Sequence, residues 1–133
     1  MKAIGGRPTR GLNIGSNVVA ADNSGARIVR ITSVKHGKSK KGRQQYAKVA
    51  DWVKVSVRAG KPELRGQVFD AVVIRQKKPY KRKGGEMVAF EDNAVAILKD
   101  EKGNPKGTMI KGPVAREILE RWKEVSKIAD FVL

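Results

Sequence analysis

The clearest pattern along the chain is an alternation of apolar and polar residues in the segment 50–58, ADWVKVSVR. In an extended chain, Val53, Val55 and Val57 fall on one side, and the residues between them fall on the other. The segment is therefore predicted to be a β-strand with one face in the core and one face toward solvent.

Other short apolar segments alternate with turn-forming residues and predict a mainly β protein. The remaining predicted strands cover residues 17–21, 26–34, 67–75, 86–90, 93–98 and 108–111. Residues 22–25, Asp-Asn-Ser-Gly, favour a tight turn between the first two. Residues 71–74 are apolar on both faces, which is typical of a central strand. Because no helical pattern lies between the strands, we expect a small closed barrel, not a doubly wound sheet.

A helical pattern occurs near the C-terminal end. Apolar residues recur there at helical spacing: Ala115, Ile118, Leu119, Trp122 and Val125. Pro113 suits a first helical position, where its missing N–H would have no partner. We expect one helix from Pro113, with its apolar stripe packed on the barrel.

The pattern divides the chain into three parts of one domain. Residues 1–16 are Gly-rich and basic without periodicity, so they are predicted to form an arm that is ordered only on a partner. Residues 17–112 form the predicted barrel, and residues 113–133 form the C-terminal helical segment.

Charge adds a candidate partner to this picture. The net charge is +16, and the stretches 35–43 and 75–83 hold 11 of the 29 Lys and Arg without an acid, where an even spread over 133 residues would place about four. Residues 113–133 carry four bases and four acids. Uncompensated bases repel one another for no structural gain, so clusters beside strands indicate a polyanion, RNA or DNA, and argue against merely solvated charge.

The candidate nucleic-acid-binding residues come from the arm and from both stretches. They are Arg7, Arg10, Lys35, Lys38, Lys40, Lys41, Arg43, Arg75, Lys77, Lys78, Tyr80, Lys81, Arg82 and Lys83. Tyr80 is included because an aromatic ring can stack on a splayed base, although packing in the core is an equal alternative. Tyr46 is expected in the core.

Catalysis and membrane insertion find little support. The chain has no cysteine, no phosphate-binding glycine motif, and a single histidine, His36, within a basic stretch. Glu86, Glu91 and Asp92 could form a metal site for phosphoryl chemistry, but carboxylates beside turns are usually solvated. The apolar runs are too short to span a bilayer, and no secretory signal is recognisable. We therefore expect a cytoplasmic protein that is not an enzyme and binds no cofactor, metal or membrane.

Four blocks carry a family resemblance: VAADNSGAR at 19–27, AVVIR at 71–75, FEDNA at 90–94, and GT through GPVARE at 107–117. In this order they resemble the universal large-subunit ribosomal proteins of family fourteen, in their archaeal and eukaryotic form. The resemblance covers about residues 17–133. It implies a five-stranded β-barrel with a projecting β-ribbon and short C-terminal helices.

The resemblance also implies partners. These are large-subunit rRNA, small-subunit rRNA across a bridge between the subunits, neighbouring large-subunit proteins, and an anti-association factor at the C-terminal region. The basic stretches fit rRNA, whereas the neutral C-terminal segment fits a protein contact through Glu117, Glu120, Glu124 and Lys127. A free-standing RNA-binding factor or chaperone on the same small barrel is the alternative.

Overall fold

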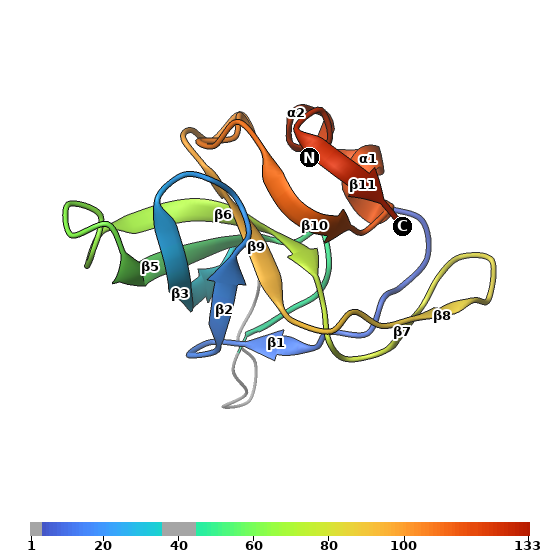
Figure 1. The fold of residues 1–133 in the computed structure, drawn as a ribbon. Helices are drawn as coiled ribbons and strands as arrows, with labels where there is room; N and C mark the ends of the chain where they lie inside the picture. Colours follow the sequence, from blue (N-terminus) through green and yellow to red (C-terminus); the bar gives the residue numbers. More distant parts are fainter. Residues whose placement is uncertain (1–3, 36–44) are drawn as a thin grey trace.

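Five strands close into a barrel in the computed structural model, which describes residues 4–35 and 45–133 (Figure 1). Around the barrel they are β2 (Asn17–Ala20), β3 (Ala26–Val34), β5 (Trp52–Gly60), β6 (Val68–Arg75) and β9 (Ala94–Leu98). Neighbours are antiparallel except β2 and β9, which are parallel and complete the closure. The barrel predicted from the strand pattern is confirmed.

The alternation in β5 puts its valines inside. Val53, Val55 and Val57 are at most 2% exposed and share one core with the buried residues of β3. The central strand β6 faces two cores. Ala71 and Val73 belong to the barrel interior, while Val72 and Ile74 pack under the C-terminal segment. This double burial explains why residues 71–74 are apolar without alternation.

The C-terminal segment differs from the single helix that was predicted. It consists of β10 (Ile110–Val114), α1 (Glu117–Arg121), α2 (Lys123–Ser126) and β11 (Ala129–Val132), with β10 and β11 parallel. Pro113 lies in β10, so the prediction that it begins a helix is wrong. It occupies an irregular point of the β10–β11 pairing, where a missing N–H is tolerated.

Trp122 separates the two short helices, because its backbone (φ −120°, ψ 71°) leaves the helical region. Its indole N–H donates to the Ala50 carbonyl at 2.9 Å, and its ring meets Trp52 edge-to-face at 6.2 Å. Of the predicted apolar stripe, Ile118, Trp122 and Val125 pack on the barrel. Ala115 packs with Tyr80 of the ribbon in a separate cluster, and Leu119 is 42% exposed. None of the helices in the described part of the chain is long and apolar enough to cross a membrane.

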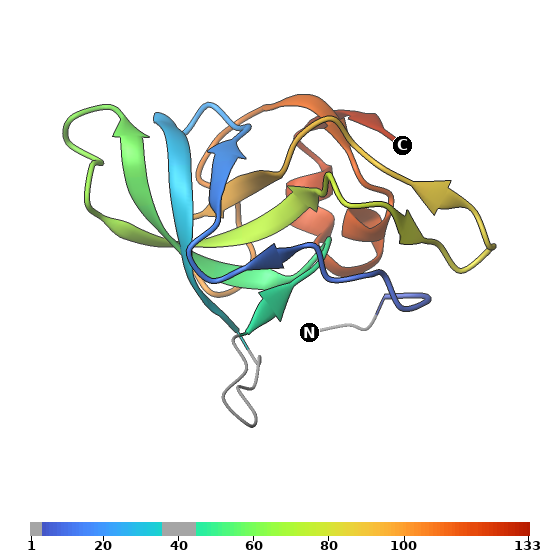
Figure 2. The ribbon, with the colours of Figure 1, turned by 90° about the horizontal axis from the view of Figure 1, so that it is seen from below.

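Residues 4–16 of the arm lie against the rest of the chain, and the expectation that the arm becomes ordered only on a partner stays a prediction. β1 (Leu12–Asn13) pairs with β4 (Tyr46–Ala47), and Leu12 is only 2% exposed (Figure 2). The Gln76 side-chain amide also donates to the Thr9 carbonyl at 2.7 Å. One buried leucine and one buried amide thus hold a segment that has no periodic pattern of its own.

The predicted turn at residues 22–25 is formed and connects distant strands. Asp22 accepts hydrogen bonds from the Ser24 hydroxyl at 2.8 Å and from the Ile97 N–H of β9 at 2.9 Å. Burial raises the pKa of the Asp22 carboxyl above its ordinary value, and these hydrogen bonds oppose the rise. Asn23 accepts from the Thr108 N–H at 2.7 Å, which fixes the chain leading into β10.

Candidate nucleic-acid interface

A two-stranded ribbon, β7 (Tyr80–Lys81) and β8 (Met87–Val88), projects from one end of the barrel (Figures 1 and 2). Four lysines of the ribbon and the segment leading into it are exposed: Lys77, Lys78, Lys81 and Lys83. None of them forms an ion pair with any described acid. The Lys77 N–H donates to the Asn93 side chain at 2.8 Å, which fixes the backbone where the chain leaves β6.

Below these lysines, three buried side chains fix the base of the ribbon. The Tyr80 hydroxyl donates to Glu117 Oε2 at 3.0 Å, and Arg82 Nε donates to Glu117 Oε1 at 2.9 Å. Arg82 also donates to the Leu133 carbonyl. Burial, together with the charge of Glu117, raises the pKa of Tyr80 to about 12. The three residues join the ribbon to α1 and to the end of β11.

Two of the predicted RNA contacts are corrected by this arrangement. Tyr80 is fully buried, so its ring cannot stack on a base. Only 10% of the Arg82 side chain is exposed, and its guanidinium is committed to Glu117. Both face inward because Tyr80 and Arg82, two residues apart, lie on the same side of an extended chain.

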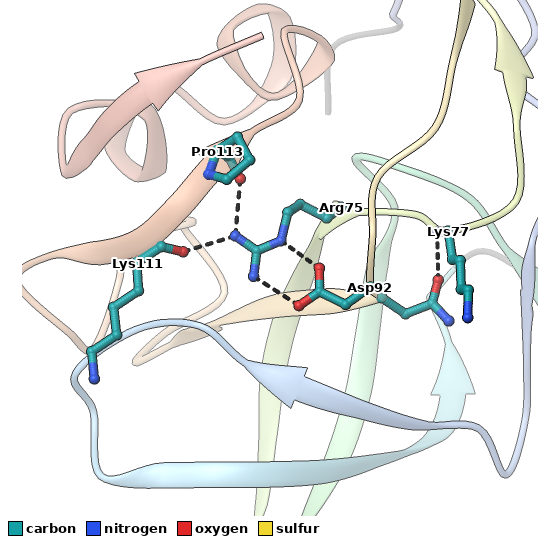
Figure 3. Close-up of polar contacts among 6 residues, drawn as sticks. Arg75, Lys77, Asp92, Lys111 and Pro113 are labelled. Atoms are coloured by element: carbon teal, nitrogen blue, oxygen red, sulfur yellow. Dashed lines mark hydrogen bonds and ion pairs between the residues drawn. The ribbon is translucent and has the colours of Figure 1, made fainter.

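Arg75 is also structural and not an RNA contact. Its guanidinium is buried and forms a double hydrogen bond with Asp92, Nε to Oδ1 at 2.8 Å and Nη2 to Oδ2 at 3.2 Å (Figure 3). Nη1 donates to the carbonyls of Lys111 at 2.7 Å and Pro113 at 3.1 Å. Arg75 therefore clamps β6 to β10. Among the described residues there is no cluster of acids or histidine able to hold a metal.

The first basic stretch is described only at its edges. Residues 36–44 lie outside the described residues, and with them the predicted contacts Lys38, Lys40, Lys41 and Arg43. Lys35 is half-buried, and its ammonium lies 5.0 Å from the centre of the Trp52 ring. Tyr46 is 45% exposed, so the expectation that it packs in the core is wrong.

In the arm, Arg7 and Arg10 are exposed, as expected of RNA contacts. Pro8 between them is buried. The arm therefore presents its two arginines while lying against the rest of the chain.

The four predicted protein-contact residues separate into two groups. Glu117 is only 6% exposed and serves the base of the ribbon, so it is not available to a partner. Glu120 is exposed and accepts a hydrogen bond from the Gly5 N–H at 2.8 Å. Glu124 and Lys127 are exposed and pair with each other at 3.1 Å.

Comparison with known proteins gives one consistent result. The family model described as "Ribosomal protein L14p/L23e" matches residues 11–133. The large ribosomal subunit protein uL14 of Nanoarchaeum equitans is 50% identical over 133 residues, covering 100% of both chains. That of Thermoplasma acidophilum is 50% identical over 135 residues, with 100% of both covered. That of Halobacterium salinarum is 46% identical over 133 residues, again over 100% of both.

Proposed function

Because the chain belongs to the ribosomal protein L14p/L23e family, we propose that it is a structural constituent of the large ribosomal subunit that binds large-subunit rRNA through its ribbon. The observation that carries this proposal is a set of four exposed lysines, without an ion pair to any described acid, on a ribbon that Tyr80 and Arg82 anchor to Glu117. Arg7, Arg10 and the bases of residues 35–43 extend the contact. The role is structural, and we expect no catalytic activity.

The chemistry of the ribbon favours the RNA backbone over the bases. A lysine ammonium is a compact charge that approaches a phosphate from many directions and carries no sequence information. The aromatic ring of the ribbon, Tyr80, is buried, so it supplies no stacking platform. With a net charge of +16, the free protein also repels itself, and a bound polyanion relieves that repulsion. The ribbon therefore recognises the shape and charge of rRNA.

The family membership also supports two finer assignments. One is a contact with small-subunit rRNA across the subunit interface, made by a basic stretch. The other is a protein-docking surface on the C-terminal helices for an anti-association factor, next to contacts with neighbouring ribosomal proteins. For the docking surface the exposed residues are Glu120, Glu124 and Lys127, without the buried Glu117.

Sedimentation tests the proposed function directly. The protein is expected to co-sediment with the large subunit at one copy per subunit and to remain bound through a moderate-salt wash. Recovery mainly in ribosome-free fractions would contradict the proposal and support a free-standing RNA-binding factor.

The docking surface predicts a separation of two activities. The variant Glu120→Lys/Glu124→Lys is expected to assemble normally but to bind the anti-association factor roughly tenfold more weakly, because like charges would then face the partner. The matched control is Glu63→Lys/Glu91→Lys, which makes the same charge change at exposed positions outside the C-terminal helices. Factor affinity equal in both variants, measured on purified large subunits, would show that this surface is not the docking site.

A further inference from the structure

A second set of exposed bases lies on the outer wall of the barrel, away from both stretches that the sequence singled out. It comprises Arg27 and Arg30 of β3, Arg58 of β5, and Lys61 and Arg65 of the loop 61–66. We call it the β3–β5 surface. None of the five forms an ion pair with an acid in residues 4–35 or 45–133. The position of this surface depends on strand pairing, so a search for runs of charge does not find it.

The register of the sheet brings two of these arginines together. Arg30 is paired with Ser56, and Arg58 follows Ser56 by two residues on the same face of β5. Val29 and Val57 pair on the opposite, buried face, so Arg30 and Arg58 both point outward. The pairing is irregular between Ile28 and Val29, which leaves Arg58 without a direct partner on β3. Arg58 still lies one pair along from Arg30 on the same outer face, where like charges repel.

The loop adds its charges beside the start of β3. The Lys61 N–H donates to the Gly25 carbonyl at 3.0 Å, which holds the loop against the turn before β3. Gly25 has φ +106°, and a Cβ there would lie 2.9 Å from Cδ of Lys61, so the glycine lets the lysine stem pass close to the turn. Glu63 is exposed and is the single acid of the loop. Five cations thus face one acid across this surface.

We propose that the β3–β5 surface binds the phosphate backbone of a second rRNA segment, distinct from the one held by the ribbon. Four of its five bases are arginines, whose planar guanidinium binds phosphate through two parallel hydrogen bonds. The loop 61–66 and the ribbon lie at opposite ends of the molecule (Figures 1 and 2). The protein therefore connects two RNA segments and gains avidity from engaging both. This inference rests on the proposed binding of rRNA.

The test compares two variants with the same change of charge. The first is Arg27→Gln/Arg30→Gln/Arg58→Gln, which retains polar side chains on the exposed wall. The control is Lys99→Gln/Lys102→Gln/Lys123→Gln, in exposed positions next to acids in the sequence. Binding of in vitro transcribed large-subunit rRNA is measured across a salt series, with hydroxyl-radical footprinting at saturation. The thermal unfolding midpoint of each free protein checks the fold.

Log affinity falls with log salt, and each phosphate contact adds roughly 0.7–0.9 to the steepness of this fall. The arginine variant is expected to make the fall shallower by about two. It should also lose one protected RNA segment while keeping the segment protected by the ribbon. Its unfolding midpoint should equal or exceed that of the unmodified protein, because a repulsion has been removed.

Other results would overturn the inference. If the arginine variant has the same slope and footprint as the control variant, the β3–β5 surface does not contact RNA. The proposed function would still stand in that case if a ribbon variant loses the footprint of the ribbon. Absence of any footprint with the unmodified protein would contradict the proposed function itself.

Discussion

Replacing the four exposed lysines of the ribbon with glutamine is expected to weaken rRNA binding by about three orders of magnitude at 0.1 M salt. The variant is Lys77→Gln/Lys78→Gln/Lys81→Gln/Lys83→Gln. Loss of four phosphate contacts, each worth roughly 0.7–0.9 in the slope of log affinity against log salt, makes this negative slope shallower by about three. Near 1 M salt counterion release contributes nothing, so the unmodified protein and the variant should have equal affinity there. At tenfold lower salt, a slope difference of about three separates their affinities about a thousandfold.

The measurement is a filter-binding titration of large-subunit rRNA at several salt concentrations. The matched control replaces Lys99, Lys102, Lys123 and Lys127 with glutamine, which removes the same charge from exposed positions outside the ribbon. Arg82 is left in place, because it is bound to Glu117 and its loss would mix unfolding with lost RNA contacts. An unchanged slope in the ribbon variant would show that these lysines do not lie on phosphate.

The barrel could be predicted because its signal is local. Alternation in β5, the all-apolar middle of β6 and the turn at residues 22–25 each specify an element within a few residues, and β3 spans Ala26–Val34 as predicted. The C-terminal segment was mispredicted because its geometry is set from a distance. The first helix ends at Trp122, whose indole N–H donates to the Ala50 carbonyl in a loop distant in sequence. Helical spacing of apolar residues does not record such a contact.

The direction of charged side chains was the main uncertainty in the candidate site. A run of bases shows where charge is concentrated, but Arg75 and Arg82 turn inward to acids that lie 17 and 35 residues further along the chain. Alternation gave a partial signal. Arg82 is two residues from Tyr80 and shares its buried side. For Arg75 alternation misleads, because the register shift after Val73 turns Arg75 to the side of Ala94, away from the barrel interior. What the sequence alone could not supply was the partner acid that makes burial of a guanidinium tolerable.

Loss of the Glu117 side chain should strongly lower stability. Glu117→Ala is expected to lower the free energy of unfolding by about 3 kcal/mol, because it leaves the Arg82 guanidinium and the Tyr80 hydroxyl without their shared acceptor in a buried position. The value lies at the low end for a broken buried pair, since the Leu133 carbonyl still accepts from Arg82.

Chemical denaturation provides the measurement, with Glu120→Ala as the matched control three residues away. Glu120 is exposed and makes one hydrogen bond to Gly5, so its loss should cost less than about 1 kcal/mol. The double variant Glu117→Ala/Arg82→Met should recover part of the loss, because the unpaired charge is removed as well. Equal unfolding free energies for the Glu117 and Glu120 variants would contradict the structural role of Glu117.

The titration of Tyr80 gives an independent measure of the same network. Its pKa of about 12 in the folded protein exceeds its ordinary value of 10.0, so the stability that this group contributes is present below pH 10 and is lost as pH rises toward 12. In Glu117→Ala the negative charge is gone while Arg82 remains, so the pKa of Tyr80 should fall. The pH range over which this stability is lost, from 10 up to the folded-state pKa, should therefore become narrower. Tyrosinate absorbance measures this in a Tyr46→Phe background, which leaves Tyr80 as the single tyrosine, with circular dichroism following the fold. A folded variant in which Tyr80 still ionises near 12 would show that Glu117 does not determine the pKa of Tyr80.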